Sequence, residues 1–164
     1  MLIFIKMKRK ITIIFLSLLS LVLGSTSCSK STSLSSICGE WKLESFAGES
    51  AESEALASEI YLNLMEGGAF ELFQKVGGGH FTAFGGTFGL DSGVLYGEYS
   101  DGSHWGGNYS VSVSGDKMEL VNSDKEDAPV YVYVRTSIPQ SVRDDAADFS
   151  QTKSVSAEEI LRFL

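Results

Sequence analysis

The two histidines of the chain, His80 and His104, are candidates for metal binding. Together with Asp101 they have the donor atoms that a divalent metal ion could use. Neither histidine stands in a spacing that is typical of a metal site, because no second ligand follows at a short, fixed interval. We therefore interpret both as solvated loop residues, and the sequence predicts no metal site.

Acidic residues occur as adjacent pairs at several places in the chain. General acid–base catalysis in a cleft needs two carboxylates that converge from separate elements, so neighbours in sequence are better interpreted as solvated charge. The sequence also lacks a Gly-x-Ser-x-Gly elbow, a Walker loop and a Rossmann glycine pattern. We predict neither an enzyme nor a cofactor. The pairs are Glu126-Asp127, Asp144-Asp145 and Glu158-Glu159.

Net charge excludes further classes of partner. The 13 Lys and Arg residues stand against 21 Asp and Glu residues, a formal net charge of -8. Four of the basic residues lie within 6–10, and the rest of the chain has 9 basic and 21 acidic residues, a net charge of -12. Phosphate contacts need clustered Lys and Arg, so nucleic acid is an unsuitable partner.

The N-terminal 1–27 segment has the layout of an export signal. A basic stretch (6–10) precedes a 13-residue apolar run (11–23), which is too short to span a bilayer as a helix. Small residues and Cys28 follow, and this order resembles the signal peptide of a bacterial lipoprotein. The resemblance implies a lipidated Cys28 and a membrane-anchored protein of the bacterial cell envelope. Ser25 stands where that motif usually has Leu, which leaves ordinary signal-peptide cleavage as the alternative.

The residues after Cys28 predict a polar tether over 28–37, rich in Ser and Thr. If Cys28 carries lipid, Cys38 is a single thiol, which we interpret as a small buried apolar residue. A Cys28–Cys38 disulfide is compatible only with a Cys28 that is not lipidated.

Short segments rich in β-branched and aromatic residues, separated by Gly, Asp and Asn, make up the region 38–136. No stretch of helical period lies between them, so the sequence predicts an all-β, antiparallel up-and-down meander. Eight strands are enough to close a barrel and remove its edges. The predicted strands are 40–47, 59–65, 69–75, 80–90, 94–99, 107–114, 117–122 and 130–136.

Connection lengths alternate along this meander. Short turns follow every second strand and longer loops follow the others, so all short turns lie at one end of the barrel. The sequence thus predicts a cup with one closed and one loop-ringed end. Alternation within the strands predicts an inward set: Trp41, Leu43, Leu62, Leu64, Phe70, Leu72, Phe84, Phe88, Leu95, Tyr99, Tyr109, Val111, Met118, Leu120, Tyr131 and Tyr133.

Gly39-Glu40-Trp41 matches the Gly-x-Trp that opens the first strand of lipocalins, and Arg135 ends the last predicted strand. The chain resembles bacterial lipocalin-like lipoproteins over about 37–136. The resemblance implies that Arg135 packs on Trp41, and we assign Gly39, Trp41 and Arg135 structural roles. No clear Thr-Asp-Tyr motif is present, so the related fatty-acid-binding topology stays open.

The region 137–164 predicts a helical extension. Ser137 and Gln140 form a capping box before an apolar stripe of Ile138, Val142, Ala146 and Phe149, which would cover the barrel exterior. A second box at Ser156 and Glu159 predicts another short helix. The last residues, 162–164, either fold back onto the barrel or form an exposed apolar tip.

The sequence favours a membrane-anchored protein that binds a small hydrophobic molecule in the barrel lumen. A lumen filled by side chains is the alternative, and such a protein would act through its surface as an envelope accessory or inhibitor. Trp105 is interpreted either as an aromatic flap over the open end or as a seal of the strand 107–114 against the core. The candidate ligand-binding residues of the lumen and its open end are Phe70, Phe84, Phe88, Tyr99, Trp105, Tyr109, Tyr131 and Tyr133.

Overall fold

The computed structural model describes residues 32–47, 57–76, 79–148 and 162–164. The predicted signal peptide (1–27), Cys28, Phe149 and the predicted helix at Ser156 lie outside the described residues. Within them, no helix has both the length and the apolar character needed to cross a membrane.

Eight antiparallel strands form where short apolar and aromatic segments alternate with Gly-containing turns, which confirms the predicted meander. Each strand begins and ends within two residues of its predicted segment. The strands are β1 (Gly39–Ala47), β2 (Ala57–Leu64), β3 (Ala69–Val76), β4 (Thr82–Asp91), β5 (Val94–Tyr99), β6 (Tyr109–Ser114), β7 (Lys117–Asn122) and β8 (Val130–Arg135).

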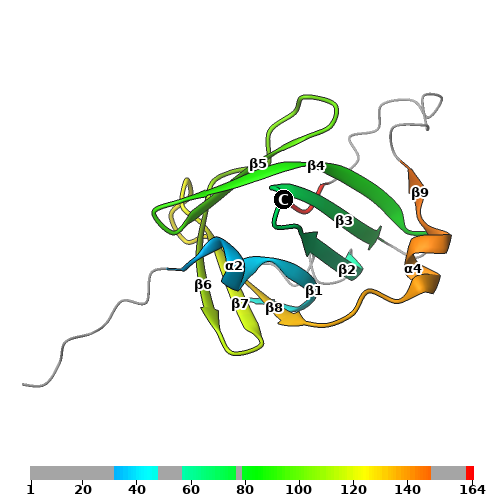
Figure 1. Ribbon diagram of the computed structural model, residues 1–164, viewed down its shortest axis with the longest axis horizontal. Helices are drawn as coiled ribbons and strands as arrows, with labels where there is room; N and C mark the ends of the chain where they lie inside the picture. The colour runs from blue at the N-terminus through cyan, green and yellow to red at the C-terminus, as the bar shows by residue number, and fades with distance from the viewer. Residues whose placement is uncertain (1–31, 48–56, 77–78, 149–161) are drawn as a thin grey trace, which may run out of the picture. The chain divides into compact units, whose positions relative to one another are not determined.

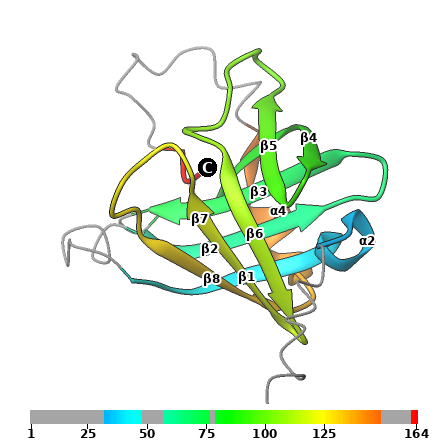
Figure 2. The ribbon, with the colours of Figure 1, turned by 90° about the vertical axis from the view of Figure 1, so that its left-hand side faces the viewer.

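The meander closes into a barrel because β1 pairs with both β2 and β8, and β3 pairs with β4 (Figures 1 and 2). A ninth strand, β9 (Ala147–Asp148), lies parallel to the start of β4. Among the eight strands of the barrel, the shortest pairing is between β5 and β6, where Val94 pairs with Ser110 and Leu95 with Tyr109. We call this short β5–β6 pairing the seam of the barrel wall, because few backbone hydrogen bonds close the wall there.

The short turns after β2, β4 and β6 lie at one end of the barrel, and the chain supports them locally. Ser92 and Gly93 both have positive φ (50° and 82°), the conformation that a tight hairpin turn requires. The described loops 79–81, 100–108 and 123–129 lie at the other end, because successive connections of a meander alternate between ends. We call the end with these loops the open end.

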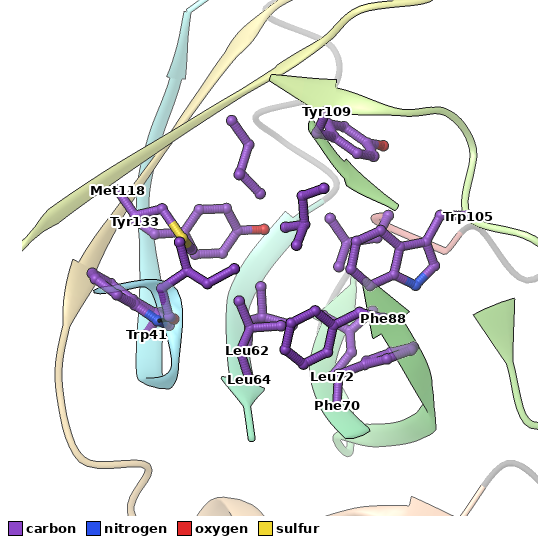
Figure 3. Packing of buried hydrophobic residues seen from close by; sticks show 14 of the residues in the cluster. Trp41, Leu62, Leu64, Phe70, Leu72, Phe88, Trp105, Tyr109, Met118 and Tyr133 are labelled. Atoms are coloured by element: carbon purple, nitrogen blue, oxygen red, sulfur yellow. Dashed lines mark hydrogen bonds between the residues drawn. The ribbon is translucent and has the colours of Figure 1, made fainter. Parts of the chain in front are cut away.

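All sixteen residues of the predicted inward set lie in one apolar cluster or pack against it. Figure 3 shows part of this cluster, with Trp41 and Trp105 on opposite sides and the hydroxyl of Tyr133 directed into its middle. Ile37, Ile60, Trp105 and Leu164 also belong to the cluster, although the strand alternation did not predict them.

The predicted structural trio meets at the closed end. The Arg135 guanidinium carbon lies 4.1 Å from the centre of the Trp41 ring, and Trp41 and Arg135 are directly paired across β1 and β8. Arg135 also donates hydrogen bonds to the carbonyl oxygens of Cys38 (3.0 Å) and Ser36 (2.9 Å). A Cβ atom at Gly39 would overlap the guanidinium, so the glycine of Gly-x-Trp makes room for the arginine.

The predicted tether (28–37) extends too far along the chain. Leu34–Ile37 forms a helical turn, α2, that is part of the barrel domain. Ile37 is fully buried, and its carbonyl oxygen accepts a hydrogen bond of 2.8 Å from the Trp41 indole. Thr32 likewise donates to the carbonyl oxygen of Val111. These contacts could not be predicted from the sequence, because Ser and Thr side chains favour loops and flexible tethers alike.

The predicted helix after the barrel begins later than its capping box indicates. Helix α4 spans Gln140–Asp145, with Pro139 at its N-cap and no capping side-chain hydrogen bond. Proline fixes the backbone at this point, and the Ser137–Gln140 box does not form. The apolar stripe does pack as predicted: Ile138, Val142 and Ala146 cover a second cluster on the barrel exterior, which contains Tyr61, Phe73 and Phe81.

A charged cluster holds α4 against the barrel. Arg143 donates to Glu40 (2.7 Å) and Glu71 (3.0 Å), and Glu40 also accepts from the backbone N–H of Ile138. Although partial burial of Glu71 opposes ionisation, hydrogen bonds from Asn63 and Arg143 hold the pKa of this carboxyl below its usual value. Glu40, the variable residue of the Gly-x-Trp motif, therefore anchors the extension.

Candidate functional site

The eight predicted lumen residues come together in the described structure. Seven are buried in the main cluster and Tyr131 packs against it half-buried. They come from five strands and one loop, because every second residue of each strand points inward. This arrangement places them in one site, while their role in ligand binding stays a prediction.

Most of these rings form a continuous edge-to-face chain across the lumen. The rings of Phe84 and Phe70 both contact Tyr99, with centroids 6.0 and 5.5 Å apart. Trp105 follows at 5.1 Å from Phe70, and Tyr109 lies 6.3 Å from Trp105. Edge-to-face pairs are favourable beyond their buried area, so this chain of rings stabilises the packing across the lumen. Tyr131 extends it, 6.3 Å from Tyr109.

Trp105 seals the weak seam between β5 and β6. Its backbone N–H donates to the carbonyl oxygen of Gly97 (3.0 Å), and His104 forms an antiparallel bridge with Glu98. The indole is only 5% exposed and lies directly on Gly97, where a Cβ atom would overlap it. The buried position of the indole fits the interpretation of Trp105 as a seal and not as a flap over the open end.

Two polar atoms inside the apolar cluster have no hydrogen-bond partner among the described residues: the hydroxyl of Tyr133 and the indole nitrogen of Trp105. Tyr133 is fully buried, and burial raises the pKa of its hydroxyl far above the usual range. Burial likewise raises the pKa of Tyr109 to about 12. These phenols are therefore neutral hydrogen-bond donors at physiological pH.

The last three residues, Arg162, Phe163 and Leu164, fold back into the open end, which settles the choice left open by the sequence. We call them the C-terminal segment. Both ribbon views show the red C-terminal end within the ring of strands (Figures 1 and 2). Leu164 is buried in the main cluster, and Tyr99 donates a hydrogen bond of 2.8 Å to its carbonyl oxygen.

Gln74 is a buried lumen residue outside the predicted inward set. It lies at the open end of β3, is 3% exposed, and its side-chain oxygen accepts a hydrogen bond of 3.2 Å from the backbone N–H of Phe163. A signal was present, because Gln74 continues the inward alternation of Phe70 and Leu72 as a polar residue. Phe163 and Leu164 had no such signal, since they follow no strand or helix period.

The histidines face different carboxylates at the barrel surface. Nδ1 of His80 lies 2.6 Å from Asp145, and Nδ1 of His104 lies 3.8 Å from Glu98. Hydrogen bonds from His80 and from the backbone N–H of Phe81 hold the pKa of Asp145 below its usual value. The described residues contain no group of three or more His, Cys, Asp or Glu that could hold a metal ion.

Cys38 is a free, partly buried thiol among the described residues. Desolvation by the surrounding structure raises the pKa of this thiol, which disfavours the reactive thiolate. Cys38 packs against the apolar cluster, in agreement with its interpretation as a small apolar residue.

Comparisons with known proteins return structures but no family. No family model matches the chain, and no curated protein matches it. An uncharacterized protein from Bacteroides eggerthii is 13% identical with a TM-score of 0.44, covering 60% of this chain and 98% of that one.

Two further similar structures have titles that refer to fatty acids. Fatty-acid-binding protein 1 of Echinococcus granulosus is 14% identical, with a TM-score of 0.39, and covers 63% of this chain and 99% of its own. A structure titled REP1-NXSQ fatty acid transporter is 12% identical with the same TM-score, covering 64% and 99%. The described architecture stands on the chain's own strand pairing: an eight-stranded, antiparallel, closed β-barrel with a short helix.

Proposed function

We propose that this protein binds a small apolar molecule with a hydrogen-bond-accepting oxygen in the lumen of its barrel, and that it catalyses no reaction. The observation that carries this proposal is a pair of buried donors, the Tyr133 hydroxyl and the Trp105 indole N–H, that have no partner in the described part of the chain and lie inside an apolar cluster. A buried donor without a partner costs about 1–3 kcal/mol. A ligand oxygen that accepts from either group would recover that cost.

The chemistry of the two donors narrows the ligand class. An indole N–H can only donate, and the neutral phenol of Tyr133 has its proton available to donate. Both groups therefore suit a carbonyl, carboxyl, ester or ether oxygen rather than an amine. The surrounding rings of Phe70, Phe88 and Tyr109 suit the apolar part of such a molecule.

The test compares two fluorescent probes that differ in the required oxygen. The purified protein is titrated with cis-parinaric acid, which carries a carboxyl group, and with diphenylhexatriene, a hydrocarbon without one. We expect saturable binding of the acid at least tenfold tighter than of the hydrocarbon. Equal affinities would contradict the role of the donors, and the absence of binding by both probes would contradict lumen binding.

Export and anchoring form the second part of the proposal. The basic and apolar stretches before Cys28 support a lipidated Cys28 and a place in the bacterial cell envelope. Membrane fractionation of cells that express the chain or its Cys28→Ser variant tests this. We expect the membrane fraction to lose the protein only in the variant. Equal membrane recovery of both forms would contradict lipidation at Cys28.

The surface-acting alternative lacks a specific supporting observation. In the described part of the chain, the large apolar side chains that are exposed are Leu34 (39%) and Tyr96 (47%), one on α2 and one on β5. Protein-binding surfaces of this kind usually present a contiguous apolar patch. Lumen binding is therefore the function that we propose for this protein.

A further inference from the structure

The C-terminal segment fills the open end as a bound peptide would. Its three residues contact β3, β4, β5 and the loop after β5, and they also contact β8, which is separated from these strands in the sheet order. Leu164 points into the apolar cluster, and Phe163 packs edge-to-face on Tyr131 with ring centroids 5.3 Å apart. An aliphatic and an aromatic side chain thus occupy two adjoining apolar positions.

Arg162 anchors the segment at the outer rim. Its guanidinium lies 2.5 Å from the carboxylate of Asp101 and also donates to the hydroxyl of Ser103. The same guanidinium lies over two rings, 4.6 Å from the centre of Tyr99 and 5.6 Å from that of Phe84. A planar cation between a carboxylate and aromatic faces is a pattern that selects arginine over lysine.

Two barrel side chains also form hydrogen bonds with the backbone of the C-terminal segment. Gln74 accepts from the N–H of Phe163, and Tyr99 donates to the carbonyl oxygen of Leu164. These two side chains come from different strands, β3 and β5, and both are buried. An acceptor for N–H and a donor for C=O at successive residues complement a peptide, whereas a simple acyl chain offers no N–H to Gln74.

We propose that the open end of the barrel is a peptide-binding site for a basic–aromatic–aliphatic sequence, and that this chain's own Arg162-Phe163-Leu164 occupies it. Gln74 and Tyr99 bind the backbone, Asp101 binds the cation, and the apolar cluster receives the aliphatic side chain. The occupant can be replaced without unfolding a strand, because it belongs to none of the strands of the barrel.

Replacement by another ligand then becomes a competition. A tethered segment acts at an effective concentration that is commonly in the millimolar range. A free peptide that binds the empty site with a Kd of about 100 μM would bind the intact chain roughly tenfold more weakly. If the lumen also binds an apolar molecule, a point that rests on the proposed function, that molecule meets the same competitor.

The test uses a fluorescein-labelled peptide with the sequence of residues 160–164 and a variant that lacks residues 162–164. Fluorescence anisotropy should show saturable binding to the shortened variant and binding at least tenfold weaker to the intact chain. The matched control is the same peptide carrying Leu164→Asp, which should bind neither form. A folded shortened variant that binds both peptides equally, or binds neither, would overturn the proposal.

A second measurement does not depend on the folding of the shortened variant. Asp101→Asn removes the ionic partner of Arg162 in an exposed loop and leaves Leu164 in place. Carboxypeptidase should release Leu164 from the intact chain at least tenfold more slowly than from the free peptide, and Asp101→Asn should accelerate the release. Release as fast as from the free peptide would show that the segment is not bound.

The two proposals fail in different ways. If the labelled peptide binds the shortened variant but neither form binds cis-parinaric acid, lumen binding is wrong and the peptide site stands. If cis-parinaric acid binds both forms equally and the peptide binds neither, the peptide site is wrong and lumen binding stands.

Discussion

At the residue scale, the hydroxyl of Tyr133 is the group whose burial most needs an explanation. It lies within a cluster of Leu, Met and Trp side chains, fully buried and without a partner among the described residues. Natural cores rarely keep such a group, because desolvation of an unpaired hydroxyl costs about 1–3 kcal/mol. A functional partner for that hydroxyl would account for its presence.

Replacing this tyrosine by phenylalanine should therefore have opposite effects on stability and binding. We expect Tyr133→Phe to raise the free energy of unfolding by about 1 kcal/mol, because the unpaired hydroxyl is removed. The same change should weaken cis-parinaric acid binding by about tenfold, through the loss of one hydrogen bond. Urea unfolding and fluorescence titration measure the two effects, and Tyr96→Phe at the exposed Tyr96 serves as the control. A loss of stability in Tyr133→Phe would mean that the hydroxyl has a partner in the folded protein.

Arg135 links the closed end to the helical turn before it. The two NH2 groups of its guanidinium donate to two carbonyl oxygens, and the guanidinium also lies over the Trp41 ring. A lysine cannot reproduce both kinds of contact. We expect Arg135→Lys to lower the free energy of unfolding by about 1–2 kcal/mol, measured by urea unfolding. Lys117→Ala, which removes an exposed ion pair with Glu44, should have little effect. Equal effects of the two changes would contradict this role of the guanidinium.

At the scale of elements, the loop 100–108 completes a wall that β5 and β6 leave open. Its seal depends on Gly97, since any side chain there must displace the Trp105 indole. We expect Gly97→Ala to expose Trp105, which would shift tryptophan emission to longer wavelength and increase quenching by acrylamide. Overpacking of this kind also destabilises by about 1–3 kcal/mol. Gly67→Ala is the matched control, because a Cβ atom at Gly67 meets nothing within 4 Å. Unchanged emission in Gly97→Ala would contradict the seal.

The elements themselves could be predicted from the sequence because strand alternation is a strong signal. Sixteen inward residues followed from the period of two, and all sixteen lie in or against the main cluster. The start of α4 could not be predicted in the same way, because Pro139 overrides the capping box that begins at Ser137. Ile37 was missed because a single apolar residue in a Ser-rich stretch has no period.

At the scale of the whole molecule, the candidate site joins residues that lie far apart in the chain. Tyr99 and Leu164 are 65 residues apart, and Gln74 and Phe163 are 89 apart. A closed meander fixes which strand ends meet at the open end, so the sequence predicted the site's aromatic lining. It could not predict the occupant, since three residues without periodicity carry no information about which surface they contact.

One acidic residue of this negatively charged chain, Asp101, forms an ion pair with Arg162 at the open end. Asp101 holds the single cation of the C-terminal segment, and hydrogen bonds from Arg162 and Ser103 keep the pKa of Asp101 well below its usual range. An aspartate whose pKa is lowered on binding stabilises the bound state fully above its ordinary pKa of about 3.9. That stabilisation is lost as the pH falls below this value. Tyr99, whose pKa burial raises, keeps its proton throughout this range.

Peptide binding to the variant without residues 162–164 should therefore be nearly constant from about pH 5 to pH 8 and weaken below about pH 4. Fluorescence anisotropy across this pH range measures the effect, with circular dichroism at each pH to verify the fold. The same variant with Asp101→Asn should bind more weakly at neutral pH and lose the dependence below pH 4. A steep change between pH 5 and pH 8, present in both variants, would show that a group other than Asp101 controls binding.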